Sequence, residues 1–600
     1  MRRTPSTPST PSTPSQAPGR PQLRDFSADR RLLLLSLMAL ATGSFGAGAA
    51  WVLLKLIALV TQIAYFHTLS TAPYHFARIE PGFWFIAVPV AGGLMVGLMA
   101  RFGSEKIRGH GIPEALDAIL SGRSRIESKV ALLKPLSSAI AIGTGGPFGA
   151  EGPIIMTGGA LGSLFAQRFH LSDAERKTLL AAGAAAGMTA IFGTPAAAIL
   201  LALEVLLFEW KPRSLVPVAV SAVVARAWRP WLIGAWPLFP QAAGPAMPWW
   251  GYGACALVGL IAGLQGALLS HAIYRVEDCF DKLPVHWMWW PALGGVVVGL
   301  GGWWDPSLLG VGYGNIGRLI AGKVPVHAAA SLLLGKAVVW IAALSSGTSG
   351  GVLAPLLIMG GALGALEAHL LPFGNPGFWA LVAMAAVLGG TLRAPLTASV
   401  FAIELTGDIH ILPAVVCACV VSYAATVLVM RRSILTERLA RRGRHLWYEY
   451  TVDPFEVTLV RDIMHHPSPT LSAELRVAEV IAMYGEFAQR HRPGGLPVVD
   501  DQGCLLDMLW PAQVLDWSRE PPAPEQRLRE RLPGACRVVG YPDEPVGQLA
   551  DRMAEAEVAC APVVQGESNR LVGLVTRRDL LHVRSRAARQ ERERARSLPC

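Results

Sequence analysis

A run of glycine and proline around a single carboxylate is the feature that most constrains the fold of this chain. Residues 143–162 read GTGGPFGAEGPIIMTGGALG, so Glu151 stands alone among apolar residues and glycines. A charged side chain at membrane depth costs at least about 2.5–3.5 kcal/mol, which makes such a residue a candidate functional site. Glycine and proline interrupt a helix, and an interruption at membrane depth is tolerated only where the backbone is buried in protein or lines a cavity.

A helix that restarts after such a break presents unpaired N–H groups and the positive end of its dipole, and the two together form an anion site. A carboxylate at that place competes with the anion for the same donors. We therefore interpret Glu151 as a built-in gate. The alternative is that Glu151 caps a helix N-terminus or pairs with an arginine or lysine.

The composition indicates a polytopic membrane protein with a more polar tail. Hydrophobic residues make up 52% of the 600 residues and charged residues only 16%, against about 25% charged residues in soluble domains. The net charge of +10 is carried mostly by arginines near the two ends of the chain. This pattern predicts cytoplasmic N- and C-termini rather than nucleic-acid binding, and we expect a bacterial inner membrane location.

Apolar segments follow one another from about residue 31 to residue 430. The first, near 31–67, is longer than the ~20 residues that cross a bilayer, so we expect a tilted helix. The others lie near 83–101, 130–143, 153–167, 178–191, 193–209, 214–227, 249–275, 288–303, 327–345, 353–371, 376–390, 394–405 and 410–430. Many are short and begin or end at glycine or proline, which points to broken helices around a binding site shared by two halves.

The two halves repeat one pattern. The lysine-to-proline interval 134–153 recurs as 336–355, and the sequence GGALG recurs at 158–162 and 360–364. Because both breaks and both helix starts recur in register, the sequence predicts an inverted repeat. The two halves are expected at about 31–228 and 249–445.

A third break, GHGIP at residues 109–113, also leads from a loop into a helix. Pro113 would stand at a first helical position, where its missing N–H costs nothing. Three converging helix N-termini would hold a dehydrated anion through N–H donors and dipoles, without a fixed arginine or lysine that would trap it. Conduction requires weak multipoint binding of this kind.

The remaining parts of the chain are polar. Residues 1–30, rich in threonine, proline and serine, predict a disordered cytoplasmic tail. After a membrane region at 31–445, two similar α+β units of about sixty residues are expected. We place them at 456–519 and 532–586, with a basic tail at 587–600. The eight cysteines show neither metal-ligand spacing nor a disulfide framework, so we expect buried free thiols and no metal site.

These motifs resemble those of the CLC family of chloride channels and proton-coupled anion exchangers, over roughly residues 31–445. The loops that resemble the signatures of that family are 109–113, 149–153 and 351–355, followed by the 393–397 turn with Glu404. The tail resembles a tandem pair of CBS domains. The resemblance implies an all-α polytopic membrane protein of tilted and broken helices with a C-terminal α+β pair, which forms a homodimer with one pore per subunit.

By the same resemblance, Glu151 is the external gating glutamate. The positions expected along the anion path are Gly109, His110, Gly111, Ile112, Gly149, Ala150, Gly351, Val352, Leu353 and Leu435. Lys134, Glu204 and Glu404 are expected to be structural residues near that path.

The chain departs from the family pattern at several of these positions. His110 replaces a serine that usually coordinates the central anion. Its imidazole can be neutral or cationic near physiological pH, so it could strengthen anion binding or make binding pH-dependent, or its ring could point away while backbone N–H groups bind. Val205 stands in place of the inner proton glutamate, and Leu435 in place of a tyrosine. Ala150 and Leu353 replace an arginine and a phenylalanine.

Together the departures favour a gated, largely passive chloride channel. The alternative is a proton-coupled chloride or fluoride antiporter with another internal proton route. A membrane-anchored nucleotide sensor is a remote alternative. No enzymatic activity is expected, because we find no nucleophile–base pair or metal cluster at membrane depth.

The second CBS unit carries the only cofactor hypothesis. Thr576 and Asp579 stand where such domains contact phosphate and ribose, which would suit an adenine nucleotide. The matching segment 503–511 of the first unit lacks this pair. We therefore favour a dimerisation and trafficking module without a ligand.

Overall fold

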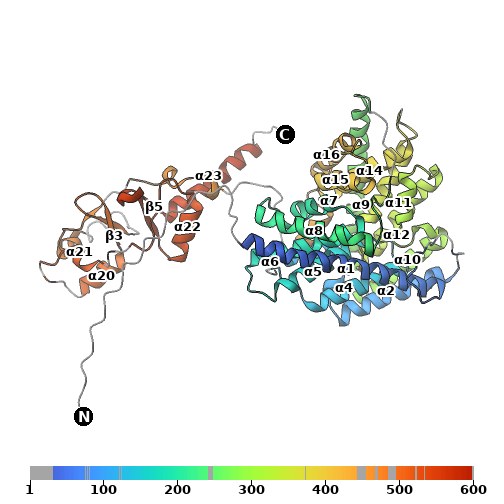
Figure 1. The fold of residues 1–600 in the computed structure, drawn as a ribbon, viewed down its shortest axis with the longest axis horizontal. Coiled ribbons are helices and arrows are strands. Elements are labelled where there is room, and N and C mark those ends of the chain that lie inside the picture. Colours follow the sequence, from blue (N-terminus) through green and yellow to red (C-terminus); the bar gives the residue numbers. More distant parts are fainter. Residues whose placement is uncertain are drawn as a thin grey trace, which may run out of the picture. The chain divides into compact units, whose positions relative to one another are not determined.

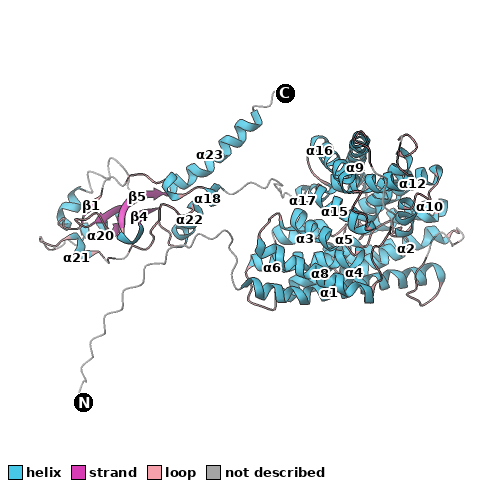
Figure 2. Cartoon of the chain, turned by 45° about the horizontal axis from the view of Figure 1, so that its top comes forward, coloured by secondary structure: helices cyan, strands magenta, loops and turns pink. Residues whose placement is uncertain are grey.

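The computed structural model describes residues 31–596 apart from 75, 77–78, 80–81, 121, 123, 241–246, 372, 442–453, 467–469, 484–494, 520–522, 524, 533 and 535. The described residues form two compact units, a larger one within residues 31–441 and a smaller one within residues 454–596 (Figures 1 and 2). The expected tail at 1–30 lies outside the described residues, as do the side chains of the expected basic tail at 587–600. The domain limits expected above stay predictions.

The larger unit is helical (Figure 1). Its helices are α1 (Arg31–Phe66), α2 (Trp84–Phe102), α3 (Ile112–Leu120), α4 (Ser128–Gly143), α5 (Glu151–Ala166), α6 (Asp173–Phe192), α7 (Pro195–Leu201), α8 (Pro212–Leu232), α9 (Gly251–Asp281), α10 (Trp290–Trp304), α11 (Tyr313–Ile320), α12 (Val326–Ser345), α13 (Leu353–Glu367), α14 (Pro376–Leu392), α15 (Pro395–Thr406), α16 (Leu412–Val429) and α17 (Ile434–Arg441).

Five of these helices, α1, α2, α9, α12 and α16, are long and apolar enough to cross a membrane. Helix α1 has 36 residues and is therefore ~54 Å long at about 1.5 Å per residue. A bilayer has a hydrocarbon core of about 30 Å, so α1 is long enough to cross it while tilted. The predicted fold class, an all-α membrane protein with tilted and broken helices, is confirmed.

The shorter helices begin where the sequence breaks. Helix α5 begins at Glu151, α13 begins at Leu353 and α3 begins at Ile112. Helix α11 begins at Tyr313 after a Gly-Val-Gly segment and was not among the predicted apolar segments, because its eight residues include polar Asn315 and Arg318.

Glycines let α5 and α6 approach at backbone distance. A Cβ atom on Gly183 of α6 would lie 2.2 Å from the carbonyl oxygen of Gly158, and one on Gly158 would lie 2.3 Å from the carbonyl oxygen of Gly183. Close packing of small residues is the usual way in which helices associate within a membrane. This contact fixes the axis of α5 and therefore the position of Glu151 at its first turn.

The smaller unit has two sheets (Figure 2). In the first, β1 (Leu471–Ser472) is parallel to β2 (Leu496–Val499), which is antiparallel to β3 (Leu505–Leu509). In the second, β4 (Cys560–Gln565) and β5 (Arg570–Thr576) are antiparallel. The helices of this unit are α18 (Pro454–Val457), α20 (Pro511–Arg519), α21 (Leu528–Arg531), α22 (Val546–Glu555) and α23 (Arg577–Arg596). A small α+β pair was predicted here.

The cysteines among the described residues are free thiols. Those of Cys255, Cys419 and Cys560 are buried, as predicted, whereas that of Cys279 is exposed. Within the smaller unit, burial raises the pKa of the Cys560 thiol to about 11. This thiol is therefore almost entirely protonated, and unreactive, at neutral pH.

We expect Gly183→Ala to destabilise the larger unit by about 1–3 kcal/mol, because the added methyl group meets a backbone carbonyl that cannot move without shifting α5. The measurement is the temperature at which half of the purified protein loses its monodisperse elution peak. Gly48→Ala in α1 is the matched control, since a Cβ atom there meets nothing within 4 Å. Equal melting of the two variants would contradict the proposed packing constraint.

Candidate anion site at the meeting of broken helices

Loops from the two halves of the membrane unit are joined by backbone hydrogen bonds. The N–H of Gly109 donates to the carbonyl of Thr348 at 3.2 Å, and the N–H of Gly350 donates to the carbonyl of Gly109 at 3.3 Å. Gly149 and Gly351 each donate to the other's carbonyl, at 3.2 and 2.9 Å. These bonds bring the three predicted loops together, directly before the first turns of α3, α5 and α13.

Glycine is needed at the meeting point for both conformation and space. Gly109 and Gly111 have φ angles of +86° and +90°, a region that residues with a Cβ atom rarely adopt. A Cβ atom on Gly152 would lie 2.0 Å from the carbonyl oxygen of His110, and one on Gly351 would lie 2.5 Å from that of Gly149. The loops therefore approach one another at backbone distance.

The side chain of Glu151 is fully buried at this meeting point. The hydroxyl of Tyr313 donates to its Oε1 at 3.4 Å, and its Oε2 has no hydrogen-bond partner among the described residues. A Cβ atom on Gly351 would lie 2.9 Å from that Oε2, so the carboxylate packs over the loop that leads into α13. Within the described chain, no arginine or lysine forms an ion pair with Glu151.

Two buried lysines each donate hydrogen bonds to backbone carbonyl groups of a loop that precedes a helix. The Nζ of Lys134 donates to the carbonyl oxygens of Ile107 and Gly109 at 2.8 and 2.7 Å. The Nζ of Lys336 donates in the same way to those of Leu308 and Gly310, at 2.8 and 2.9 Å. Both lysine side chains are fully buried. Each ammonium group therefore neutralises the carbonyl dipoles of a loop that precedes a helix.

The second of these loops was missed in the sequence. Residues 310–312 read GVG and repeat the spacing of GHG at 109–111, with φ angles of +64° and +77° at the two glycines. The N–H of Gly310 donates to the carbonyl of Gly145 at 3.0 Å, which ties this loop to the break before α5. Tyr313 follows directly and reaches Glu151, so the repeated Gly-X-Gly spacing was the signal that could have found it.

His110 lies within a buried charged cluster. Its side chain is 3% exposed, and its Nδ1 has no hydrogen-bond partner among the described residues. Close by, Glu114 accepts from the N–H of Gly111 at 2.9 Å and forms an ion pair with Arg438 at 3.4 Å. Glu114 thus caps the first turn of α3, while Arg438 of α17 offsets its negative charge.

Glu204 and Glu404 each cap a helix of the opposite half. Glu204 accepts from the backbone N–H and the hydroxyl of Thr397, at 2.9 and 2.5 Å, in the first turn of α15. Glu404 accepts from the N–H groups of Ala196 and Ala197, at 3.0 and 2.8 Å, in the first turn of α7. A carboxylate at a helix N-terminus satisfies orphan donors and complements the dipole. The exchange locks the two halves together.

The remaining predicted positions offer no polar side chain. Val205 lies in a π-helical turn, Ala202–Leu207, and is fully buried. The other buried apolar residues of the predicted set are Ile112, Ala150, Val352, Leu353 and Leu435. They can contribute only backbone groups to an anion.

In the smaller unit, Thr576 and Asp579 contact each other. The backbone N–H and the hydroxyl of Thr576 donate to Oδ2 of Asp579 at 2.8 and 2.7 Å. The other oxygen of Asp579 lies 2.6 Å from Nε2 of His465. Both carboxylate oxygens are therefore occupied in this structure, and a nucleotide ribose would have to compete with His465.

We expect Lys336→Met to destabilise the protein by at least about 2 kcal/mol, since two buried carbonyl groups lose their donor. Thermal unfolding of the purified protein measures this. Lys129→Met, at an exposed position on α4, is the control and should melt like the unmodified protein. An unchanged melting temperature for Lys336→Met would show that the 308–310 loop does not depend on this ammonium group.

Comparison with known proteins supplies the family. Residues 92–427 match the family profile described as "Voltage gated chloride channel", and residues 460–509 and 538–586 match the CBS domain. The voltage-gated ClC-type chloride channel ClcB of Shigella flexneri is 30% identical over 373 residues, which cover 60% of this chain and 87% of that protein. A putative ClcB-like chloride channel protein of Ralstonia nicotianae is 29% identical over 375 residues, covering 61% and 87%.

Three solved structures share the fold. A slow cyanobacterial Cl⁻/H⁺ antiporter superposes with a TM-score of 0.60 at 22% identity and covers 69% of this chain and 99% of its own. A CLC-type fluoride/proton antiporter superposes with a TM-score of 0.59 at 20% identity and covers 68% of this chain and 98% of its own. A eukaryotic CLC transporter superposes with a TM-score of 0.54 at 19% identity and covers 91% of this chain and 97% of its own. The chain therefore belongs to the voltage-gated chloride channel (CLC) family, a family of multi-pass membrane transporters rather than enzymes, and it carries a C-terminal pair of CBS domains.

Proposed function

We propose that this protein is a chloride channel whose largely passive conduction is gated by Glu151. Family membership supports chloride as the transported ion. The observation that carries the gate is the position of Glu151, a fully buried carboxylate without a basic partner in the described chain, at the point where three helices begin.

The electrostatics of this point suit an anion that has to leave again. The first turns of α3, α5 and α13 present backbone N–H groups and positive dipole ends. The nearest buried ammonium groups, those of Lys134 and Lys336, already donate to backbone carbonyls. They add positive potential without offering a direct ion pair, so binding stays weak enough for conduction.

Gating follows from competition for these donors. In this structure the carboxylate of Glu151 lies over the loop before α13 and receives a 3.4 Å contact from Tyr313. A chloride ion and this carboxylate cannot occupy the same space or share the same N–H groups. Conduction therefore requires the side chain of Glu151 to move, and this movement breaks its contact with the hydroxyl of Tyr313.

The loss of a carboxyl group at the inner proton position favours passive conduction. Val205 occupies the position of the inner proton glutamate and is fully buried. The adjacent Glu204 is committed to capping α15 through Thr397. The alternative, a proton-coupled chloride or fluoride antiporter, is favoured by the two antiporters among the structures that share the fold, and it would need a different internal proton route.

The proposal also covers the location of the protein, its oligomeric state and the role of the CBS pair. We place the protein in a bacterial inner membrane as a homodimer with one pore per subunit and cytoplasmic termini. The CBS pair serves dimerisation and trafficking without a ligand, because Asp579 is already paired with Thr576 and His465. An adenine nucleotide would bind only by displacing His465.

Glu151→Ala should accelerate chloride efflux from liposomes by about tenfold, which corresponds to removing about 1.4 kcal/mol of competition for the anion site. Efflux is followed with a chloride electrode while a trapped dye reports internal pH. Glu127→Ala is the control, because Glu127 is an exposed carboxylate at the start of α4 whose only ion pair among the described residues is with Lys106. Unchanged chloride efflux in Glu151→Ala would remove the gate from the proposal. Rapid fluoride efflux without chloride efflux would point to the fluoride alternative.

The unmodified protein should release chloride without moving protons, whereas Val205→Glu should add a proton flux that depends on the chloride gradient. The new carboxyl group supplies the titratable side chain that this position lacks. The control is Val205→Gln, because a glutamine side chain has nearly the same shape as a glutamate side chain but cannot titrate. In this variant chloride movement should stay uncoupled from protons. Proton movement in a fixed ratio to chloride in the unmodified protein would overturn passive conduction and favour the antiporter.

A further inference from the structure

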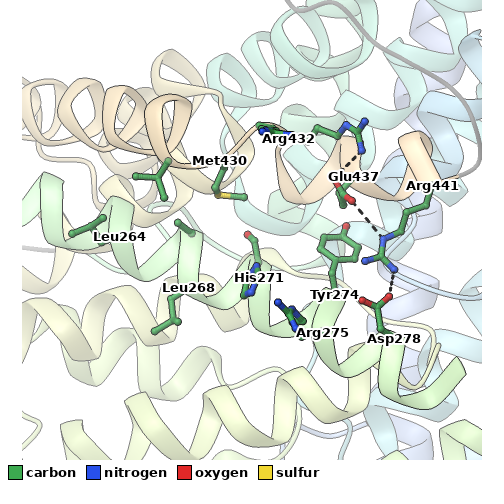
Figure 3. A pocket seen from close by; sticks show the side chains of 14 residues that line it. Leu264, Leu268, His271, Tyr274, Arg275, Asp278, Met430, Arg432, Glu437 and Arg441 are labelled. Atoms are coloured by element: carbon green, nitrogen blue, oxygen red, sulfur yellow. Dashed lines mark hydrogen bonds and ion pairs between the residues drawn. The ribbon is translucent and has the colours of Figure 1, made fainter. Parts of the chain in front are cut away.

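A groove of about 520 Å³ lies between α9 and the segment from Val429 to Arg441 (Figure 3). The residues of α9 that line the groove change from apolar to charged along the helix. Leu264 and Leu268 line one end, and Arg275 and Asp278 line the other.

The apolar end is open and belongs to a helix long and apolar enough to cross a membrane. Leu264 and Leu268 are 47% and 69% exposed. From Leu264 to Arg275 the helix rises by ~16 Å at about 1.5 Å per residue. That is close to half of the ~30 Å hydrocarbon core, so the groove is long enough to run from the headgroup level to about the middle of the bilayer.

The other end carries an excess of positive charge. Arg441 pairs with Asp278 at 2.6 Å and with Glu437 at 3.5 Å. Arg275 and Arg431 also line the groove. Both are exposed, and neither forms an ion pair within the described chain. With Arg432 included, four guanidinium groups face two carboxylates.

This combination selects one class of occupant. A soluble anion would use the arginines but gain nothing from exposed leucines, and a zwitterionic lipid would bring no net charge to the basic end. Basic pockets between transmembrane helices bind anionic lipid headgroups. We propose that this groove binds an anionic phospholipid, with its phosphate between Arg275 and Arg431 and an acyl chain along Leu264 and Leu268.

A lipid in this groove would brace α9 against α17. The hydroxyl of Tyr274, in the groove wall, donates to the carbonyl of Ile434 at 2.6 Å. The guanidinium of Arg441 lies over the Tyr274 ring, 4.8 Å from its centroid. Ile434 directly precedes Leu435. A lipid bound in the groove would therefore hold the first turn of α17 in place. This holds whether the protein is a channel or an antiporter.

Native mass spectrometry of the full chain, titrated with phosphatidylglycerol or phosphatidylethanolamine of equal acyl length, tests the proposal. We expect the unmodified protein to retain phosphatidylglycerol in preference. Arg275→Gln combined with Arg431→Gln should weaken this retention roughly 30-fold. Lys129→Gln combined with Arg168→Gln, which removes the same charge from exposed positions outside the groove, should leave it unchanged.

Leu268→Trp tests the apolar end separately, because it fills the groove and keeps all the arginines. It should lose phosphatidylglycerol as well. Equal retention of the two lipids, equal weakening by the control pair, or full retention by Leu268→Trp would overturn the proposal. So would displacement of the lipid by glycerol phosphate at the same concentration, which would show a soluble-anion site. Disulfide-linked dimers of Leu268→Cys would overturn it too, because a second copy would then cover the groove.

Discussion

Everything in the membrane unit depends on how the backbone groups freed by broken helices are satisfied without water. At membrane depth each unpaired N–H or carbonyl costs several kcal/mol. The chain pairs the loops of one half with those of the other, through Gly109 with Thr348 and Gly350 and through Gly149 with Gly351. The groups left over at the helix starts are N–H donors. The pairing that makes the breaks tolerable therefore leaves N–H donors and positive helix-dipole ends, on which the proposed anion site depends.

The inverted repeat makes this arrangement stable because each half completes the other. Lys134 and Lys336 play equivalent parts behind equivalent loops, and Glu204 and Glu404 cap helices across the repeat boundary. The starts of α7 and α15 are therefore each satisfied by a carboxylate of the other half. A repeat whose halves exchange caps has one relative placement that satisfies all of them, so the meeting point of the helices is set by hydrogen bonding as much as by apolar packing.

Glycine spacing and the repeated lysine were enough to predict the fold class, the inverted repeat and the loops around Glu151. Tyr313 was not predicted, because α11 is short and partly polar and therefore carries no hydropathy signal. The pairing of Asp579 with His465 joins residues far apart in the chain, and no local pattern shows it. The groove beside α9 was missed for a related reason: its leucines and Arg275 lie on α9, but the other three arginines that line it come from residues 431–441, far away in the sequence.

The departures from the family pattern alter the side chains of the candidate site and leave its backbone intact. Of the residues that depart from the pattern, Ala150, Leu353 and Leu435 are buried and can offer only main-chain groups. An anion site built from helix N-termini does not need those side chains to attract an anion; it needs them to decide how tightly the anion is held and what travels with it. The replacement of the expected tyrosine by Leu435 and of the inner proton glutamate by Val205 removes a hydroxyl and a titratable group, which is the physical basis of the proposal that this protein conducts anions without coupling them to protons.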